Sequence, residues 1–413
     1  MGHFLMVALG SAGDVNPFLG LALALRNRGH EITLLSAPRF AGAAGAVGAE
    51  FYALGTAEEY DAMYEEPDLW HPRRGLKIYF SYLAELVNQT VRLVEALHKP
   101  AETVVLAPFQ CFGARVAQEA IGVPLGTILP YPISLQSAFD PNRTPIGNPP
   151  RWMGRSAVRM MYWVANWEVS RHTRDSINAA RRTRNLAPPV RDVVRWSYSP
   201  HLILGLWPSF FSAPQSDWPP QARNTGFLSY DGPSSASWAP PNHLPDREDW
   251  LVFTPGSQMT HGADYFRFAC EAAAKLDLPT VMVSADRTAL PSQLPGNVYH
   301  LPFAPFSWLF RRAVGVVHHG GIGTAARALE AALPQLIIPR GFDQFDNAHR
   351  VARIGAGAWL DRKYLSGSSL HAAIRDLLQS QRIQRRCKGI QAELSKASPL
   401  EETCSAIEEL LPN

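Results

Sequence analysis

Apolar runs and helix-like patterns alternate along the first half of the chain. The apolar run 4–9 leads through a glycine-serine turn into a helix pattern over 18–27, and a second apolar run follows at 31–35. A strand, a helix and another strand in this order predict a βαβ unit. The same patterns predict further strands at 103–107, 126–129 and 201–206 and a helix at 114–121. The first half therefore predicts a doubly wound α/β domain.

A second set of patterns begins at residue 250 and repeats this organisation. It predicts strands at 250–254, 280–284, 298–302, 313–317 and 335–339, and helices at 264–275, 324–333, 369–380 and 401–411. Between 217 and 249 the chain is crowded with proline, serine and asparagine, which is typical of a linker. We therefore expect a first domain over 1–222, a linker over 223–248 and a second domain over 249–390.

Length and charge narrow the class of protein. A chain of 413 residues exceeds the usual size of a single domain, so two hydrophobic cores are expected. The formal net charge of +3 is close to balance and gives no support to nucleic-acid binding. The short basic runs 181–184 and 385–386 fit solvated helix faces, although a weak contact with an anionic membrane stays open.

The cysteines and the N-terminal segment indicate a reducing environment. The cysteines lie far apart without a Cys-x-x-Cys pair and are expected to be reduced packing residues: Cys111, Cys270, Cys387 and Cys404. The N-terminus has no basic region before its apolar run, and no apolar run reaches the roughly eighteen residues of a membrane-spanning helix. We expect a cytoplasmic protein, with room for a peripheral contact at the inner membrane.

A glycine-rich turn joins the predicted strand 313–317 to an alanine-rich helix, with the sequence Val-His-His-Gly-Gly-Ile-Gly-Thr over 317–324. The unpaired N–H groups and the positive dipole end of that helix would face the turn, where they can stabilise a pyrophosphate without a metal ion. His319 and the hydroxyl of Thr324 add hydrogen-bond donors. Such a turn could also serve only to close a strand-to-helix connection.

A second polar loop, 339–347, follows the next predicted strand. Because ligands of doubly wound sheets bind at the carboxyl ends of the strands, Asp343 and Gln344 are expected at the same edge as the glycine-rich turn. A carboxylate and an amide together offer the acceptors and donors that sugar hydroxyls require. The loop contains no Asp-x-Asp motif, so we expect no metal ion. The two loops together predict a nucleotide-sugar site.

These two loops also carry a family resemblance. The pattern His-Gly-Gly-x-Gly-Thr followed by Pro-x-x-x-Asp-Gln-x-x-Asn resembles the donor signature of the family 1 glycosyltransferases. The resemblance implies the GT-B fold, in which two Rossmann-like doubly wound domains face a central cleft. It also implies that the C-terminal helix, within 391–413, packs back on the N-terminal domain.

The resemblance assigns roles to residues that bind the donor. It implies that the pyrophosphate is bound by His319, by the amides of Gly321, Gly323 and Thr324, and by Ser257 and Asn347. His318 would then be a strand-end residue. Phe303 and Ala304 match the place where the family holds the nucleobase, although 301–305 could also be an ordinary strand-exit loop. Whether the base is thymine or uracil stays open.

Asp14 is the candidate catalytic base, on the loop expected after the first strand. Its segment Gly-Asp-Val-Asn-Pro, 13–17, resembles a variant found in sterol glucosyltransferases and in the rhamnosyltransferase of rhamnolipid synthesis, where many family members carry a histidine. A carboxylate with an ordinary pKa near ~3.9 is ionised at neutral pH and can accept a proton. An aspartate before a helix could also be an N-cap or turn carboxylate, and the two roles are compatible.

The acceptor side is less specific. Segments 58–98 and 130–215 are rich in aromatic residues, which favours an apolar acceptor. Tyr162, Trp163 and Trp167 include helical spacing, and this is more typical of a packed core than of a ligand wall.

Scattered agreement across most of the chain makes the resemblance closest to the rhamnosyltransferase of rhamnolipid synthesis. It implies inverting transfer of a sugar, with rhamnose from dTDP-rhamnose favoured, to a lipophilic hydroxyl such as that of a 3-hydroxyacyl lipid. It needs no cofactor beyond the nucleotide-sugar co-substrate, and an acyltransferase partner could supply the acceptor. Alternatives are a UDP-glucose-dependent transferase acting on a sterol or polyketide, a nucleotide-sugar epimerase and a non-catalytic auxiliary protein.

Overall fold

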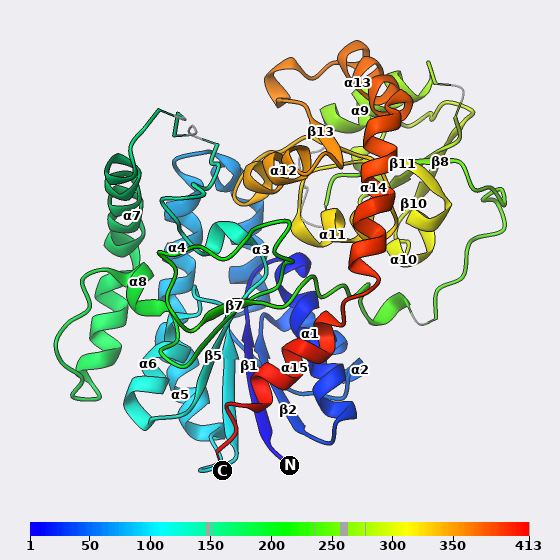
Figure 1. Cartoon of the computed structure of the whole chain (residues 1–413). Helices are drawn as coiled ribbons and strands as arrows, with labels where there is room; N and C mark the ends of the chain where they lie inside the picture. The colour runs from blue at the N-terminus through cyan, green and yellow to red at the C-terminus, as the bar shows by residue number, and fades with distance from the viewer. Residues whose placement is uncertain (146–148, 151, 236, 257–262, 277, 413) are drawn as a thin grey trace. The chain divides into compact units, whose positions relative to one another are not determined.

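The computed structural model describes residues 1–145, 149–150, 152–235, 237–256, 263–276 and 278–412. The chain divides into two compact units, which are both drawn in Figure 1. Unit 1 comprises Met1–Tyr230 and Ser398–Asn413, and unit 2 comprises Asp231–Ala397. The expected boundaries were at 222 and 391, whereas the observed units change at 230 and again at 397.

Unit 1 contains a parallel sheet whose strand order in the described residues is β3-β2-β1-β4-β5-β6-β7. Its strands are β1 His3–Ala8, β2 Glu31–Ser36, β3 Glu50–Ala53, β4 Thr103–Ala107, β5 Leu125–Leu129, β6 Leu202–Gly205 and β7 Ala222–Asn224. The central strands β1 and β4 are buried along their whole length, as expected for apolar runs covered on both faces. The order reverses between β1 and β4, which makes their carboxyl ends the switch point of the sheet.

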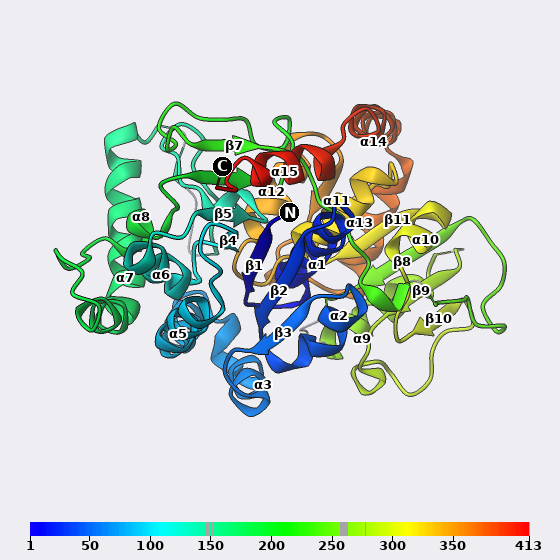
Figure 2. The same cartoon turned by 90° about the horizontal axis from the view of Figure 1, so that it is seen from below.

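Helices cover both faces of this sheet, as Figures 1 and 2 show. They are α1 Ala12–Asn27, α2 Ala41–Ala46, α3 Ala57–Glu65, α4 Gly75–Glu85, α5 Val87–Leu97, α6 Phe112–Ile121, α7 Arg155–Arg182, α8 Val193–Ser197 and α15 Pro399–Glu408. A doubly wound α/β unit results, as the sequence predicted.

The last helix, α15, packs within unit 1 beside α1. Glu408 accepts hydrogen bonds from Arg28 at 2.6 Å and from His30 at 2.9 Å. The Thr403 hydroxyl contacts the Thr225 hydroxyl at 2.7 Å, so the segment after β7 is also held in unit 1. These contacts explain why unit 1 extends past residue 222 and why it regains the end of the chain.

Unit 2 repeats the doubly wound design with the strand order β10-β9-β8-β11-β12-β13 in its described part. Its strands are β8 Trp250–Thr254, β9 Thr280–Val283, β10 Val298–Leu301, β11 Ala313–His318, β12 Gln335–Ile337 and β13 Gly357–Trp359; its helices are α9 Ala263–Ala273, α10 Phe306–Leu309, α11 Ile322–Glu330, α12 Gln344–Arg353, α13 Gly367–Gln379 and α14 Gln381–Leu394. All strand pairs are parallel. The order reverses between β8 and β11, where Thr254 pairs with His318.

Two sequence expectations are corrected by the fold. Helix α1 begins at Ala12 rather than at residue 18, so Asp14 lies in the first helical turn and not on a loop. The early start has a local cause, because Ser11 and Asp14 form a capping box across that turn. Trp163 and Trp167 are not core residues: both are more than half exposed on α7.

Two other expectations concern the cysteines and membrane segments. All four cysteines are buried and unpaired, as expected for reduced packing residues. None of the described helices is both long and apolar enough to cross a bilayer.

Candidate functional site

The turn between β11 and α11 is fixed by His318. The Gly320 amide donates to its Nδ1 at 3.1 Å, so Nε2 carries the proton and donates to Gln335 Oε1 at 3.0 Å. Burial lowers the pKa of His318 to about 3, which keeps the ring neutral. His318 is therefore a strand-end residue that shapes the turn from below.

Gly320 has to be a glycine at this turn. Its φ is +97°, and a Cβ there would lie 2.8 Å from Ile337 Cγ2. The backbone can therefore pass close to β12 before α11 starts.

His319 follows on the other side of the backbone and lies against two glycines. A Cβ on Gly256, at the end of β8, would come within 2.7 Å of its ring, and a Cβ on Gly321 within 2.5 Å. Its buried Nδ1 has no hydrogen-bond partner among the described residues. Burial lowers the pKa of His319 to about 4, with a smaller contribution from Arg340. This neutral ring has an unused polar atom at the sheet's switch point.

The start of α11 carries the other expected phosphate contacts. Gly321 is the N-cap residue, with φ −61° and ψ 139°, and no side chain caps the helix. Gly323 is exposed, and a Cβ on it would have nothing within 4 Å; Thr324 is almost fully buried. The first N–H groups of this nine-residue helix therefore face the turn without a side-chain cap, which is the arrangement that binds anions.

The second signature loop is tied to this turn by Asn347. Its Nδ2 donates to the Gly320 carbonyl at 2.9 Å and to Asp343 Oδ2 at 2.7 Å. Both amide hydrogens are thus used on protein atoms, while the buried Oδ1 has no partner in the described residues. In this arrangement Asn347 positions Asp343 against the turn, and direct binding of Asn347 to a phosphate stays a prediction.

Gln344 holds the same loop from inside. Its Oε1 accepts from the backbone N–H groups of Arg340 at 2.8 Å and Gly341 at 3.2 Å. Its amide nitrogen makes no hydrogen bond to a described residue and remains available to a ligand. The preceding Phe342 has φ +50°, a strained value for a residue with a side chain. Asp343 and Gln344 are therefore brought to the glycine-rich turn, as the sequence predicted.

Arg340 was not singled out from the sequence. Its guanidinium lies close enough to His319 to lower the pKa of that ring. Burial lowers the pKa of Arg340 itself to about 10, so it stays a cation at neutral pH. A half-buried positive charge beside an anion-binding helix start adds to the electrostatic preference for a pyrophosphate.

The expected nucleobase contacts lie after β10 in the same unit. The Phe303 side chain is 36% exposed, whereas Ala304 is buried. The Phe303 carbonyl accepts a hydrogen bond from Trp238 at 3.2 Å. An exposed ring on a backbone held in this way can stack on a base. Ser257, the remaining phosphate candidate, lies outside the described residues.

Asp14 sits at the switch point of the unit 1 sheet. Its Oδ2 accepts from the Ser11 backbone N–H and hydroxyl, both at 2.8 Å. A Cβ on Gly10, whose φ is +127°, would lie 2.5 Å from the same oxygen. Burial raises the pKa of Asp14, and hydrogen bonds from Ser11 and Tyr131 partly oppose the rise. The carboxylate is thus both part of a capping box and a group with raised basicity.

Tyrosines surround this carboxylate. Tyr60 donates to the Gly10 carbonyl at 2.9 Å and packs on Tyr64 with ring centroids 4.7 Å apart. Burial raises the pKa of Tyr60 to about 12 and holds those of Tyr64 and Tyr79 well above their usual value, and the Asp14 charge adds to each rise. The aromatic content near the first strand therefore forms walls around Asp14 and keeps it in a partly apolar environment.

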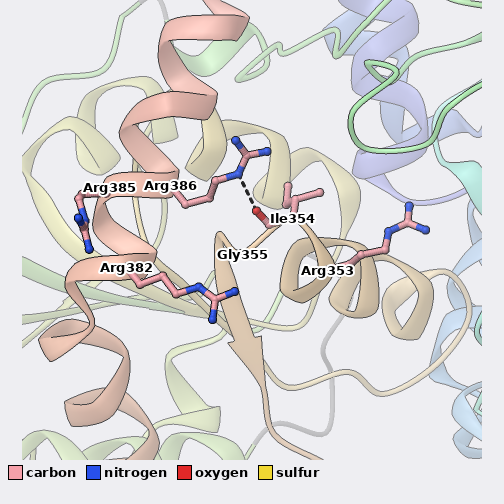
Figure 3. A pocket seen from close by; sticks show the side chains of 6 residues that line it. All are labelled: Arg353, Ile354, Gly355, Arg382, Arg385 and Arg386. Carbon is pink, nitrogen blue, oxygen red and sulfur yellow. Dashed lines mark hydrogen bonds between the residues drawn. The ribbon is translucent and has the colours of Figure 1, made fainter.

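Unit 2 also has an arginine-lined cavity of about 480 Å³, shown in Figure 3. It lies between the end of α12 and the start of α14, and its lining residues are Arg353, Ile354, Gly355, Arg382, Arg385 and Arg386. Arg386 donates to the Ile354 carbonyl at 2.9 Å, while Arg385 and Arg353 point away from that contact. None of the candidate donor residues lines this cavity.

Potential metal ligands are scattered rather than clustered. Within the described ranges, no group of three or more His, Cys, Asp or Glu side chains is placed to hold a metal ion.

Family models match both ends of the chain. Residues 4–136 match the glycosyltransferase family 28 N-terminal domain, and residues 268–410 match the C-terminal domain of erythromycin biosynthesis protein CIII-like proteins. The first match contains Asp14 and the second contains both signature loops of unit 2.

Individual proteins are similar over nearly the whole chain. The O-mycaminosyltylonolide 6-deoxyallosyltransferase of Streptomyces fradiae is 28% identical, over 98% of this chain and 96% of its own. A sterol 3-beta-glucosyltransferase of Arabidopsis thaliana is 26% identical, over 91% of this chain and 62% of its own.

Solved structures share the fold at lower sequence identity. The calicheamicin glycosyltransferase CalG4 has a TM-score of 0.74 at 22% identity, covering 100% of this chain and 98% of its own. The spinosyn rhamnosyltransferase SpnG complexed with thymidine diphosphate has a TM-score of 0.69 at 20% identity, covering 98% of this chain and 99% of its own.

Proposed function

We propose that this chain, a glycosyltransferase of the GT-B fold, transfers a sugar from a nucleoside-diphosphate donor to a hydroxyl of an apolar acceptor, with inversion at the anomeric carbon. The observation that carries the proposal is the turn before α11. There, His319 presents an unpartnered Nδ1 beside uncapped helix N–H groups. The sugar-sized contacts Asp343 and Gln344 are tied to the same turn.

The donor's charge is stabilised by the protein alone in this proposal. The pyrophosphate lies at the start of α11, where the amides of Gly321, Gly323 and Thr324 and the ring of His319 donate to it. Arg340 adds a positive charge, and Ser257 and Asn347 complete the cradle. The Asp343 carboxylate accepts from sugar hydroxyls and the Gln344 amide nitrogen donates to them. Phe303 and Ala304 hold the base. No metal ion is required.

Asp14 is the proposed base. The acceptor hydroxyl gives its proton to the Asp14 carboxylate while its oxygen forms a bond to the anomeric carbon. The bond from that carbon to the diphosphate oxygen breaks, and the nucleoside diphosphate leaves with the electron pair. The raised pKa of Asp14 favours this transfer, because a stronger base still remains ionised near neutral pH. The charge that develops on the leaving group is stabilised by the α11 N-terminus and its neighbours.

A 6-deoxyhexose carried on thymidine diphosphate is the first candidate donor, with rhamnose as the favoured sugar. This choice is supported by a relative named as a 6-deoxyallosyltransferase and by the spinosyn rhamnosyltransferase, which shares the fold. The matching acceptor is a lipophilic hydroxyl. A macrolide-like polyketide has the support of that relative, and a 3-hydroxyacyl lipid, which an acyltransferase would supply, rests on the sequence resemblance.

The second candidate is transfer of glucose from UDP-glucose to a sterol. The observation in its favour is the sterol 3-beta-glucosyltransferase relative, together with the Gly-Asp-Val-x-Pro segment at Asp14. The two candidates differ in donor base, sugar and acceptor shape, so they separate in one experiment.

The test is mass spectrometry of products from purified protein. Parallel reactions combine dTDP-rhamnose or UDP-glucose with a macrolide aglycone, a sterol or a 3-hydroxyacyl lipid, and Asp14→Asn is the control. An acceptor that gains one sugar with native protein and not with the variant supports the proposal and identifies the donor. Conversion of the nucleotide sugar into its epimer without an acceptor, or binding of a donor with no turnover on any acceptor, contradicts it.

A further inference from the structure

Helix α7 of unit 1 exposes a continuous apolar stripe. Met160, Trp163, Val164 and Trp167 expose 61%, 61%, 52% and 51% of their surface. Their spacing of three and four residues places them on one face of the helix. Isolated exposed apolar residues are common on proteins, but two tryptophans with a methionine and a valine in one stripe indicate an interaction surface. We refer to these four residues as the α7 stripe.

The opposite face of α7 is firmly packed, so the α7 stripe is not a loosely held segment. Val158, Asn166, Val169, Thr173 and Ile177 are buried on that face. Figures 1 and 2 both show α7 at the outside of unit 1, away from its central sheet. Trp152, shortly before the helix, is 84% exposed and extends the apolar surface past its N-terminus.

Arginines continue the same ridge at both ends of the α7 stripe. Arg155 and Arg159 precede Trp163 at intervals of four residues, and Arg171 follows Trp167 by four. Arg159 makes no ion pair with a described residue, and Arg155 stacks on the exposed ring of Phe139 at 4.0 Å.

One of these arginines is partly neutralised. Arg171 lies over the Trp167 ring at 5.4 Å and pairs with Glu168 at 3.3 Å. The ridge thus keeps a net positive charge at its N-terminal end, around Arg155 and Arg159.

We propose that the α7 stripe docks unit 1 on the surface of an anionic phospholipid bilayer. Tryptophan prefers the level of the lipid headgroups, and an apolar helix face flanked by arginines is the pattern of helices that lie in this interface. The unpaired cations at its end match a negative surface better than they match a second copy of the same positive stripe. This inference extends the proposed function, because apolar acceptors accumulate in bilayers.

The test measures binding of the full chain to sedimenting vesicles. Vesicles of phosphatidylcholine with about 30% phosphatidylglycerol are compared with pure phosphatidylcholine vesicles, and binding is expected only to the anionic ones at physiological salt. The double variant Trp163→Ala/Trp167→Ala is expected to lower the partition coefficient by at least about tenfold. Arg155→Glu/Arg159→Glu is expected to lower it similarly, and high salt should weaken binding of the native chain.

Matched controls come from unit 2. Trp359, which is 44% exposed on β13, gives the variant Trp359→Ala, and the cavity arginines give Arg382→Glu/Arg385→Glu. Both should bind vesicles like the native chain. Equal binding by the α7 variants, or loss of binding in the arginine control instead, overturns the proposal. So does an absence of vesicle binding, and a concentration-dependent dimer that Trp163→Ala/Trp167→Ala dissociates would then identify a second copy as the occupant.

Failure of this inference can be separated from failure of the proposed function. Sugar transfer to a water-soluble acceptor is measured without vesicles for the native chain and for Trp163→Ala/Trp167→Ala. Retained transfer also shows that the variant is folded. Transfer without vesicle binding contradicts only the docking surface, whereas vesicle binding without transfer to any acceptor contradicts only the proposed reaction.

Discussion

The side-chain amide of Asn347 donates a 2.9 Å hydrogen bond to the carbonyl oxygen of Gly320, which joins the second signature loop to the turn before α11. The second amide hydrogen goes to Asp343 at 2.7 Å. One buried side chain therefore sets the position of the proposed sugar contact relative to the proposed phosphate turn. This bridge explains why an asparagine inside a helix can matter for a ligand without touching it.

Replacement of Asn347 by alanine should damage both binding and stability. The Gly320 carbonyl and the Asp343 carboxylate lose their donor, and a buried acceptor left unsatisfied costs about 1–3 kcal/mol. We expect a lower unfolding midpoint in urea and nucleotide-sugar affinity reduced by about tenfold, or about 1.4 kcal/mol. The control is Asn27→Ala at the exposed end of α1. Native affinity in Asn347→Ala would show that the bridge does not organise the site.

Gly320 and Gly323 should respond oppositely to alanine. Gly320→Ala places a Cβ at φ +97° and 2.8 Å from Ile337, so we expect destabilisation of at least about 1–2 kcal/mol. Gly323 is inside α11 with nothing within 4 Å of an added Cβ, so Gly323→Ala should stabilise the fold by about 0.5–1 kcal/mol. Urea unfolding of the two variants measures the contrast. Equal stabilities would contradict the observed turn.

Arg340→Gln should weaken donor binding more than folding. The guanidinium contributes positive charge beside His319, and charge-assisted contacts to phosphate are about twice as strong as neutral ones. Affinity for the nucleoside diphosphate is expected to fall by about tenfold, with little change for the nucleoside alone. Arg362→Gln is the control, because Arg362 affects the pKa of Arg340. Calorimetry with both ligands measures the difference, and an equal loss for the nucleoside would assign Arg340 to the fold.

His319 should couple donor binding to proton uptake. In the free protein burial lowers its pKa to about 4, below the ordinary 6.5. A bound pyrophosphate favours the charged ring and raises this pKa, so affinity should increase as the pH falls from 7.5 towards 5.5. Calorimetry in buffers of different ionisation enthalpy counts the protons. In His319→Gln the uptake should shrink to that of the ligand itself, and an unchanged uptake would remove His319 from the phosphate contact.

The same two histidines predict how stability depends on pH. Because the folded pKa values of His318 and His319, about 3 and about 4, lie below 6.5, the unfolded chain binds more protons between these values. Their contribution to stability is therefore complete above pH 6.5 and is lost as the pH falls towards the folded pKa values. Thermal unfolding should show a smaller acid loss in His319→Gln than in the native chain.

The sequence predicted the central strands because they are apolar along their length. β1 and β8 are buried at every position, and this gives an uninterrupted apolar run. The strands β3, β7 and β13 were missed, since they are short and half-exposed at positions beside or at the sheet edge and leave no such run. Edge strands form because a neighbour offers hydrogen bonds, which is information that the local pattern does not contain.

The candidate site was predictable where spacing carries the chemistry. The glycine turn and the Asp343-Gln344 pair stand at fixed distances from apolar strands, so their common edge followed from the topology. Arg340 was missed because a single arginine in a loop has no pattern. The exposure of Trp163 and Trp167 was missed because helical spacing does not say which face is covered. Both depend on what packs alongside.

Asp14 should prove separable into a catalytic role and a structural one. Its folded pKa is raised by burial, so its ionisation costs stability as the pH rises through that value, and Asp14→Asn should have an equal or higher melting temperature. The asparagine oxygen can still accept from Ser11, which preserves the capping box. Turnover should nevertheless fall by about 10²–10⁴, the range for a lost general base. Ser11→Ala gives the complementary result, since it removes a hydrogen bond that lowers the pKa of Asp14, so the acid limb of the kcat profile should move to higher pH. A stable Asp14→Asn protein with native turnover would leave Asp14 only its place in the helix cap.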